Sequence, residues 1–325
     1  MNMETILVTG ADLAPPALKL LSNFELIFAG KAPTEDDVIA LCKRHNPIGV
    51  IVRYGKFARA AMEAAPALRV ISRHGAGVDV IDLDAARALG IDVRAAVGVN
   101  AAAVAEHAAA LLLASAKSTV KLDERMREGH WDKSTHKSQE LGGKTVGLVG
   151  LGAIGRRFAR IADAMDMKVI GFDPGARDLP DYVEKVSLGD IWTRSDVISL
   201  HCPLTDSNRM MINADVLAKC KRGVMLVNTA RGGLVDEDAL LDALRSGQVF
   251  AAGLDSFAQE PLAADHPFLK EANVVLSPHV GGVSVETYVN LGLTAANNLL
   301  SMLATARQQF QSSIPQTKRR TKGSS

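Results

Sequence analysis

The sequence predicts an α/β protein with two doubly wound, parallel-sheet domains. At 325 residues the chain is longer than one hydrophobic core usually supports, so two domains are expected. Short β-branched runs alternate with helical patterns along the chain, which is typical of βαβ units joined into parallel sheets. One long helical stretch, residues 100–128, separates the first set of these units from the second.

The first set of units predicts a five-stranded, flavodoxin-like domain. Its strands are expected at Ile6–Val8, Leu26–Phe28, Ile48–Val52, Arg69–Ser72 and Ile91–Val93. A helix over Asp82–Leu89 should stop at Gly90, because glycine accepts the left-handed backbone that ends many helices. A last helix, near Val285–Ala306, should return to pack on this domain, which then comprises residues 1–99 and 285–310.

The second set of units predicts a larger sheet within residues 100–284. Its six strands are expected at Thr145–Val149, Lys168–Phe172, Val197–Leu200, Gly223–Asn228, Val249–Leu254 and Asn273–Leu276. The remaining residues, 311–325, combine basic residues with Thr, Gly and Ser, and we expect them to form a disordered tail.

Composition and charge exclude several classes of protein. The 37 Lys and Arg nearly balance the 36 Asp and Glu, so no strong field attracts nucleic acid or an anionic membrane, and a small-molecule partner is favoured. The most apolar helical stretch, Ala108–Ala116, is too short to span a bilayer. Three cysteines at unrelated spacings argue against a disulfide framework and a zinc site. We therefore expect a cytoplasmic protein without a structural metal.

A glycine-rich turn follows the strand Thr145–Val149 and precedes a helix expected to begin near Arg156. Gly150 permits the tight turn, Gly152 lets the backbone approach a pyrophosphate, and Gly155 lets helix and strand pack closely. The free N–H groups at the helix start would hold the phosphates.

An acidic residue, Asp173, ends the next strand, where it can accept hydrogen bonds from the adenosine ribose hydroxyls. The same carboxylate would repel a 2′-phosphate. The second domain is therefore predicted to be a Rossmann domain that binds NAD in preference to NADP.

Polar residues at strand ends late in the chain suggest the chemistry. Arg231, Glu260 and His279 each follow a predicted strand, and ligands of parallel sheets bind at those carboxyl ends. A keto-acid reduction needs a cation for the carboxylate and a general acid for the forming alkoxide. Arg231 suits the first role and His279 the second, while Glu260 would orient the imidazole and favour its charged form.

Five segments resemble, in the same order, motifs of the D-isomer-specific 2-hydroxyacid dehydrogenase family. They are VGLVGLGAIGRRFA, SLHCPLTDSNRMMIN, LVNTARGGLVDEDAL, GLDSFAQEPL and LSPHVGG. The resemblance covers most of residues 5–305 and identifies Arg231, Glu260 and His279 with the family's catalytic triad. It also implies a homodimer built around the long helix. By the same resemblance the NAD site is lined by Ala153, Ile154, Asp173, Cys202, Thr229, Ala230, Asp255 and Gly281.

The resemblance leaves the substrate open. It implies that the backbone amides of Ala76 and Gly77 bind the substrate carboxylate, and it places Arg53 where phosphoglycerate dehydrogenases direct an arginine at a distal phosphate. Such a cation would suit phosphoglycerate or another dianionic acid, although Arg53 could equally be a surface cation at a strand end. The alternative is a glyoxylate/hydroxypyruvate reductase that acts on small monoanions.

Two further interpretations are less favoured by the residues. The first is a non-catalytic, NAD-sensing scaffold like the C-terminal-binding-protein corepressors, for which the chain shows no peptide-groove signature. The second is oxidation of formate or phosphite. Formate dehydrogenases of this type carry Gln in place of Glu260, and phosphite oxidation uses a lysine in the loop where this chain has Arg73 and His74.

Overall fold

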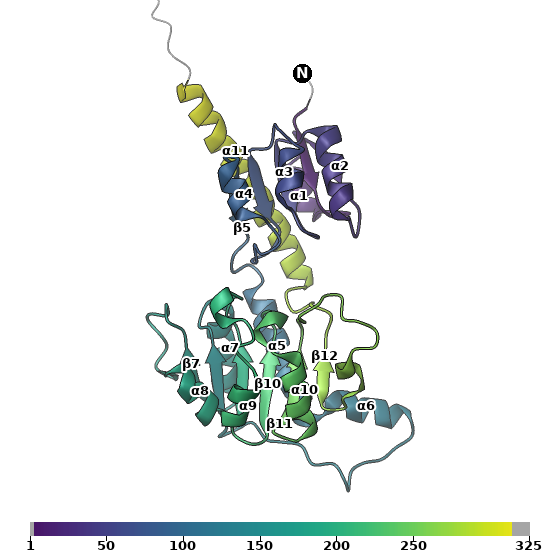
Figure 1. The fold of residues 1–325 in the computed structure, drawn as a ribbon, viewed down its shortest axis with the longest axis vertical. Coiled ribbons are helices and arrows are strands. Elements are labelled where there is room, and N and C mark those ends of the chain that lie inside the picture. Colours follow the sequence, from purple (N-terminus) through teal and green to yellow (C-terminus); the bar gives the residue numbers. More distant parts are fainter. Residues whose placement is uncertain (1–2, 314–325) are drawn as a thin grey trace, which may run out of the picture. The chain divides into compact units, whose positions relative to one another are not determined.

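The computed structural model describes residues 3–313, which form two compact units (Figure 1). The first unit comprises the chain up to Asn100 together with the chain from Ser284 onward, and the second comprises Ala101–Val283. Within the described residues, no helix is both long and apolar enough to cross a membrane. The predicted tail, 311–325, lies outside the described residues except for its first three positions.

The first unit is built on a five-stranded sheet, as the sequence predicts. All strand pairs are parallel, and the order is β2-β1-β3-β4-β5, which is the flavodoxin-like order. The strands are β1 (Thr5–Val8), β2 (Glu25–Phe28), β3 (Gly49–Val52), β4 (Val70–Arg73) and β5 (Asp92–Ala95). The order reverses between β1 and β3, so the chain leaves these two neighbouring strands toward opposite sides of the sheet.

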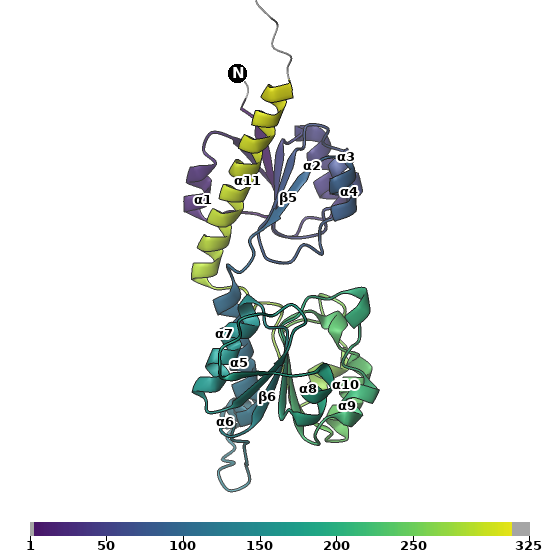
Figure 2. The ribbon, with the colours of Figure 1, turned by 90° about the vertical axis from the view of Figure 1, so that its left-hand side faces the viewer.

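Helices cover both faces of this sheet (Figure 2). The helices α1 (Pro15–Leu20) and α11 (Val285–Ser313) cover one face, where Leu299 packs with Ile6 and Val8. The helices α2 (Glu35–His45), α3 (Arg59–Glu63) and α4 (Leu83–Ala88) cover the other.

Local sequence explains where two of these helices begin and end. Thr34 and Asp37 form a capping box at the start of α2, in which each side chain accepts the other residue's backbone N–H. Asp82 caps α4, and Gly90, with φ of +67°, follows its end as predicted. The last helix was predicted to end near Ala306, but α11 continues to Ser313. No glycine or proline lies between these two positions, so no residue there stops the helix.

The second unit contains a seven-stranded parallel sheet with the order β12-β11-β10-β9-β6-β7-β8. The strands are β6 (Thr145–Val149), β7 (Lys168–Phe172), β8 (Val183–Lys185), β9 (Val197–Leu200), β10 (Val224–Asn228), β11 (Val249–Leu254) and β12 (Val274–Leu276). The prediction of six strands was wrong because it missed β8. This edge strand has three residues, of which only Val183 is buried, so its sequence carries no alternating pattern.

Two layers of helices also cover the second sheet (Figure 2). The helices α5 (Ala101–Lys117) and α7 (Ala153–Ala164) cover one face, and α8 (Leu188–Arg194), α9 (Ala214–Lys219) and α10 (Glu237–Arg245) cover the other. Three short 3-10 helices are η1 (Asp206–Asn208), η2 (Gly232–Leu234) and η3 (Pro267–Lys270).

The long helical stretch expected at 100–128 is two helices. It breaks at Ser118, which has φ of +53°, and continues as α6 (Thr119–Arg127). The first part is not a free connector, because α5 packs on the sheet of the second unit. A Cβ atom at Gly253 in β11 would lie 2.8 Å from the Cβ of Leu111, so this glycine permits the close approach of α5.

Candidate active site

The glycine-rich turn joins β6 directly to α7, which begins at Ala153 rather than near Arg156. Gly150 has φ of +98°, and a Cβ there would lie 2.7 Å from the carbonyl carbon of His201. A Cβ at Gly155 would lie 2.1 Å from the carbonyl oxygen of Gly150, so only glycine fits both positions. A Cβ at Gly152 would meet no protein atom within 4 Å. The turn is therefore tight on its protein side and open where a ligand would approach.

Asp173 lies directly after β7 and is held by the same turn. Its Oδ2 atom accepts the N–H of Leu151 at 2.8 Å, and its Oδ1 atom accepts the N–H of Gly175 at 2.8 Å. Two backbone donors therefore fix the position of the carboxylate. Cys202 follows β9 nearby, and burial raises the pKa of its thiol to about 11, so it is a neutral group.

The backbone after β10 carries Arg231. Asn228 fixes this backbone, because its amide donates to the carbonyl of Arg231 at 2.9 Å and its Oδ1 accepts the N–H of Ala230 at 3.0 Å. A Cβ at Gly232 would lie 1.8 Å from the carbonyl carbon of Phe257. The turn that carries Arg231 is therefore packed tightly against the loop after β11. Thr229 in this turn is buried.

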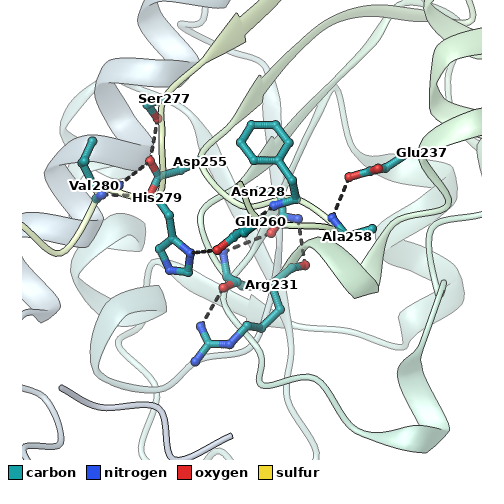
Figure 3. Close-up of polar contacts among 12 residues, drawn as sticks. Asn228, Arg231, Glu237, Asp255, Ala258, Glu260, Ser277, His279 and Val280 are labelled. Carbon is teal, nitrogen blue, oxygen red and sulfur yellow. Dashed lines mark hydrogen bonds and ion pairs between the residues drawn. The ribbon is translucent and has the colours of Figure 1, made fainter. Parts of the chain in front are cut away.

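The loop after β11 presents Glu260, and the loop after β12 presents His279. The Nδ1 atom of His279 lies 2.7 Å from Oε2 of Glu260, while Oε1 of Glu260 accepts the N–H of Phe257 at 3.0 Å. Figure 3 shows the imidazole and the carboxylate pointing toward each other. The two side chains keep 45% and 39% of their surface exposed, so the pair is open to solvent and to a ligand. His279 has φ of +53°.

A buried carboxylate, Asp255, organises the loop that carries His279 (Figure 3). Its Oδ1 atom accepts the hydroxyl of Ser277 at 2.6 Å and the N–H of Val280 at 2.9 Å, and its Oδ2 atom accepts the N–H of Gly281 at 2.8 Å. Asp255 is only 1% exposed. A Cβ at Gly281 would lie 2.8 Å from Oδ2, which explains the glycine there.

Two residues that support these loops were not predicted from the sequence. His107 of α5 lies 2.8 Å from the hydroxyl of Ser277 and 3.3 Å from Oδ1 of Asp255. Glu237, at the start of α10, accepts the N–H of Ala258 at 2.8 Å and so holds the loop that presents Glu260. Each reaches its partner from a different element, so no local spacing indicated the contact.

The first unit holds the three predicted substrate residues. Arg53 follows β3, and Ala76 and Gly77 lie in the loop after β4. Arg73 braces this loop, because its Nε donates to the carbonyl of Gly77 at 3.0 Å and its Nη1 donates to the carbonyl of Val52 at 2.8 Å. The side chain of Arg53 is only 7% exposed, so it is not a surface cation.

Comparisons with known proteins identify the family. Residues 109–281 match the model described as the NAD-binding domain of D-isomer-specific 2-hydroxyacid dehydrogenases. The chain belongs to the D-isomer-specific 2-hydroxyacid dehydrogenase family. It is therefore an enzyme, an oxidoreductase of the 2-hydroxyacid dehydrogenase class.

Two curated relatives show where the similarity extends. The chain is 38% identical over 289 residues to a hydroxypyruvate reductase of Thermotoga maritima, which covers 88% of this chain and 94% of that protein. It is also 38% identical over 308 residues to a D-3-phosphoglycerate dehydrogenase of Mycobacterium tuberculosis, covering 94% of this chain. The match spans only 58% of that longer protein.

Solved structures agree with the fold. The TT0316 protein of Thermus thermophilus superposes with a TM-score of 0.87 at 35% identity, over 93% of this chain and 97% of that one. An acyclic imino acid reductase, solved with NADPH and D-Arg, superposes with a TM-score of 0.81 at 27% identity, over 94% of this chain and 97% of that one.

Proposed function

We propose that the enzyme interconverts a small 2-keto acid and its D-2-hydroxy acid, with His279 as the proton donor to the keto oxygen. The observation that carries this proposal is the 2.7 Å contact between Nδ1 of His279 and Oε2 of Glu260 in a pair that remains accessible. A carboxylate on one ring nitrogen orients the imidazole and leaves the other nitrogen, Nε2, for a substrate. This arrangement is what a general acid needs.

The glycine turn fits a dinucleotide. Gly152 leaves space beside the N-terminus of the 12-residue helix α7, whose free N–H groups favour a pyrophosphate. The nicotinamide cofactor, when bound, supplies or accepts the hydride at C2 of the acid. Ala153 and Ile154, in the first turn of α7, and Thr229, Ala230 and Gly281, in the turns after β10 and β12, would line the same cofactor.

We infer that the preferred cofactor is NAD rather than NADP. Asp173 is fixed by the amides of Leu151 and Gly175, so its carboxylate can accept the ribose hydroxyls but would repel a phosphate in their place. Cys202 adds no charge there, because burial raises the pKa of its thiol.

The remaining groups bind and polarise the acid. Arg231 is the cation for the substrate carboxylate, and a planar guanidinium can hold such a group through two parallel hydrogen bonds. In the first unit, the backbone amides of Ala76 and Gly77 would be donors for a substrate carboxylate. In reduction, protonated His279 gives its proton to the keto oxygen as the hydride reaches C2. In oxidation, neutral His279 takes the hydroxyl proton, so the same residue serves both directions.

The test replaces the proposed acid while keeping its size and polarity. In His279→Gln, turnover of glyoxylate and hydroxypyruvate with NADH should fall about 100-fold to 10,000-fold, because the group acts in the transition state. The Kd for NADH, measured by fluorescence titration, should change less than about threefold. The exposed His130→Gln is the matched control. Wild-type turnover in His279→Gln would show that another group is the acid, and a wild type inactive on every 2-keto acid would refute the reaction.

A further inference from the structure

The sheet of the first unit has a topological switch point between β1 and β3, where strand order reverses. Ligands of open α/β sheets bind at the carboxyl ends of the strands at such a point. Two short segments meet there: one follows β1 and contains Asp12, and the other begins with Arg53 after β3. Buried Thr9 ties them together, because its hydroxyl accepts the N–H of Arg53 and donates to the carbonyl of Tyr54, both at 2.9 Å.

The Arg53 side chain is fixed at this point. It is only 7% exposed, and its guanidinium lies 5.2 Å from the centre of the Tyr54 ring and 5.6 Å from that of Tyr288. A Cβ at Gly10 would lie 3.0 Å from Cδ of Arg53, so the stem of the arginine crosses this glycine. Its buried Nε has no hydrogen-bond partner among the described residues. The guanidinium therefore has a fixed position and an unused donor.

Asp12 already forms an ion pair with the guanidinium of Arg53. Nη1 of Arg53 donates to the carboxylate of Asp12 and to its backbone carbonyl. The hydrogen bond from Arg53 lowers the pKa of Asp12, and a hydrogen bond with Tyr288 lowers it further, so the group is a carboxylate at neutral pH. The Asp12 side chain is 64% exposed. At the switch point, the carboxylate of Asp12 is therefore accessible to a ligand, whereas the guanidinium of Arg53 is buried.

The histidine that interacts with Arg53 and Asp12, His74, does not restore a positive charge. His74 follows β4, next to β3 in the sheet, and burial, reinforced by the charges of Arg53 and Arg73, lowers its pKa to about 4. It is neutral at physiological pH. A ligand that brings a second anion to this point would either displace Asp12 from Arg53 or lie beside it, and in both cases two anions would be close together. Like charges in such a position cost binding free energy, whereas a neutral group costs none.

We propose that Asp12 is a specificity-determining residue that makes the enzyme select 2-keto acids with a single anionic group over acids with a second, distal anion. The inference rests on the proposed function and narrows its substrate to 2-keto acids that carry no second anionic group. It reverses the expectation that Arg53 anchors a distal phosphate, because the chain itself supplies the anion for that arginine.

The test compares hydroxypyruvate with 3-phosphohydroxypyruvate, which differ only by the phosphate. Wild-type enzyme with NADH should have the higher kcat/KM for hydroxypyruvate. In Asp12→Asn, the ratio of kcat/KM for the phosphorylated acid to that for hydroxypyruvate should rise about tenfold, because the substitution removes the competing charge at constant size. Asp84→Asn, which removes a carboxylate from an exposed pair with Arg87 in the same unit, should leave the ratio unchanged.

A second measurement does not depend on turnover of the dianion. Inorganic phosphate should inhibit Asp12→Asn competitively with hydroxypyruvate at about tenfold lower concentration than wild type. A wild type that already prefers the phosphorylated acid overturns the inference, as does a ratio that Asp12→Asn leaves unmoved while hydroxypyruvate is reduced. If the wild type binds NADH but reduces neither acid, the proposed function fails and this inference fails with it.

Discussion

The carboxyl edges of the two sheets hold their charged side chains differently. In the second unit, His279 and Glu260 keep 45% and 39% of their side-chain surface exposed, and Asp255, the carboxylate that fixes the loop of His279, is buried. In the first unit the order is inverted: the cation Arg53 is buried, and its counter-ion Asp12 is exposed. The exposed His279–Glu260 pair, in which the loop of His279 is held in place, can exchange a proton with a ligand. A buried cation with its own counter-ion acts only on ligands that compete for it, so the first edge selects and the second reacts.

The largest effect expected from this comparison should follow a change in Asp255, the buried carboxylate that supports the loop of His279 in the second unit. Asp255→Asn would place an amide NH₂ against one or more of the donors of Ser277, Val280 and Gly281. A buried donor left unpaired costs about 1–3 kcal/mol, and the upper end corresponds to about 100-fold in rate if the loop of His279 shifts. We expect kcat at saturating NADH to fall by about that factor.

The control for this variant is again Asp84→Asn, which removes an exposed carboxylate. Urea unfolding of both variants would separate a local shift of the loop from a general loss of stability. A kcat within about twofold of wild type in Asp255→Asn would break the comparison, because the reacting pair would then not depend on the buried carboxylate.

Much of this second edge could be predicted from the sequence, because it depends on short segments that follow buried strands. Arg231, Glu260 and His279 were chosen for their places after such strands, and the structure does bring Glu260 and His279 into contact. The contacts that hold them were not predictable in the same way. His107 reaches Asp255 from a helix far away in the sequence, and a lone histidine in an alanine-rich helix carries no local pattern.

The first edge was predicted less completely, for a related reason. Arg53 was singled out by its place after a strand, but its role depends on Asp12, which lies 41 positions away on the neighbouring strand's loop. Strand order decides which loops meet, and alternating patterns in the sequence do not state strand order. Similarly, the backbone of Ser118 takes a left-handed conformation that serine rarely adopts, so the break between α5 and α6 could not be predicted from residue type.

An intermediate effect concerns the dependence of stability on acid pH, because each unit has a histidine whose pKa is lowered by burial. Burial lowers the pKa of His74 in the first unit and of His201 in the second to about 4, from 6.5. Below pH 6.5 the unfolded chain binds protons that the folded chain does not, so stability falls as the pH falls from 6.5 toward 4. Near pH 5 each histidine should cost about 2 kcal/mol.

Urea unfolding between pH 7 and pH 4.5 would measure this loss. His74→Gln and His201→Gln should each reduce its steepness, while the exposed His130→Gln should not. If only His201→Gln has an effect, His74 is protonated more easily than its burial implies. The switch point in the first unit would then carry an additional positive charge in acid, and the contrast between the two edges would weaken below neutral pH.

The smallest expected effect concerns the choice of cofactor. It tests whether the carboxylate of Asp173 makes the second unit select NADH over NADPH. Asp173 resembles Asp12 in that a ligand phosphate would have to approach an anion, but two backbone amides hold it in place of a cation. Asp173→Ser removes the charge and leaves a hydroxyl that can bind a ribose or a phosphate. The ratio of kcat/KM for NADPH to that for NADH should therefore rise about tenfold. The exposed Asp163→Asn on α7 is the control. An unchanged ratio would mean that the 2′-phosphate does not meet Asp173, and selection by a fixed carboxylate would then be a property of the first unit alone.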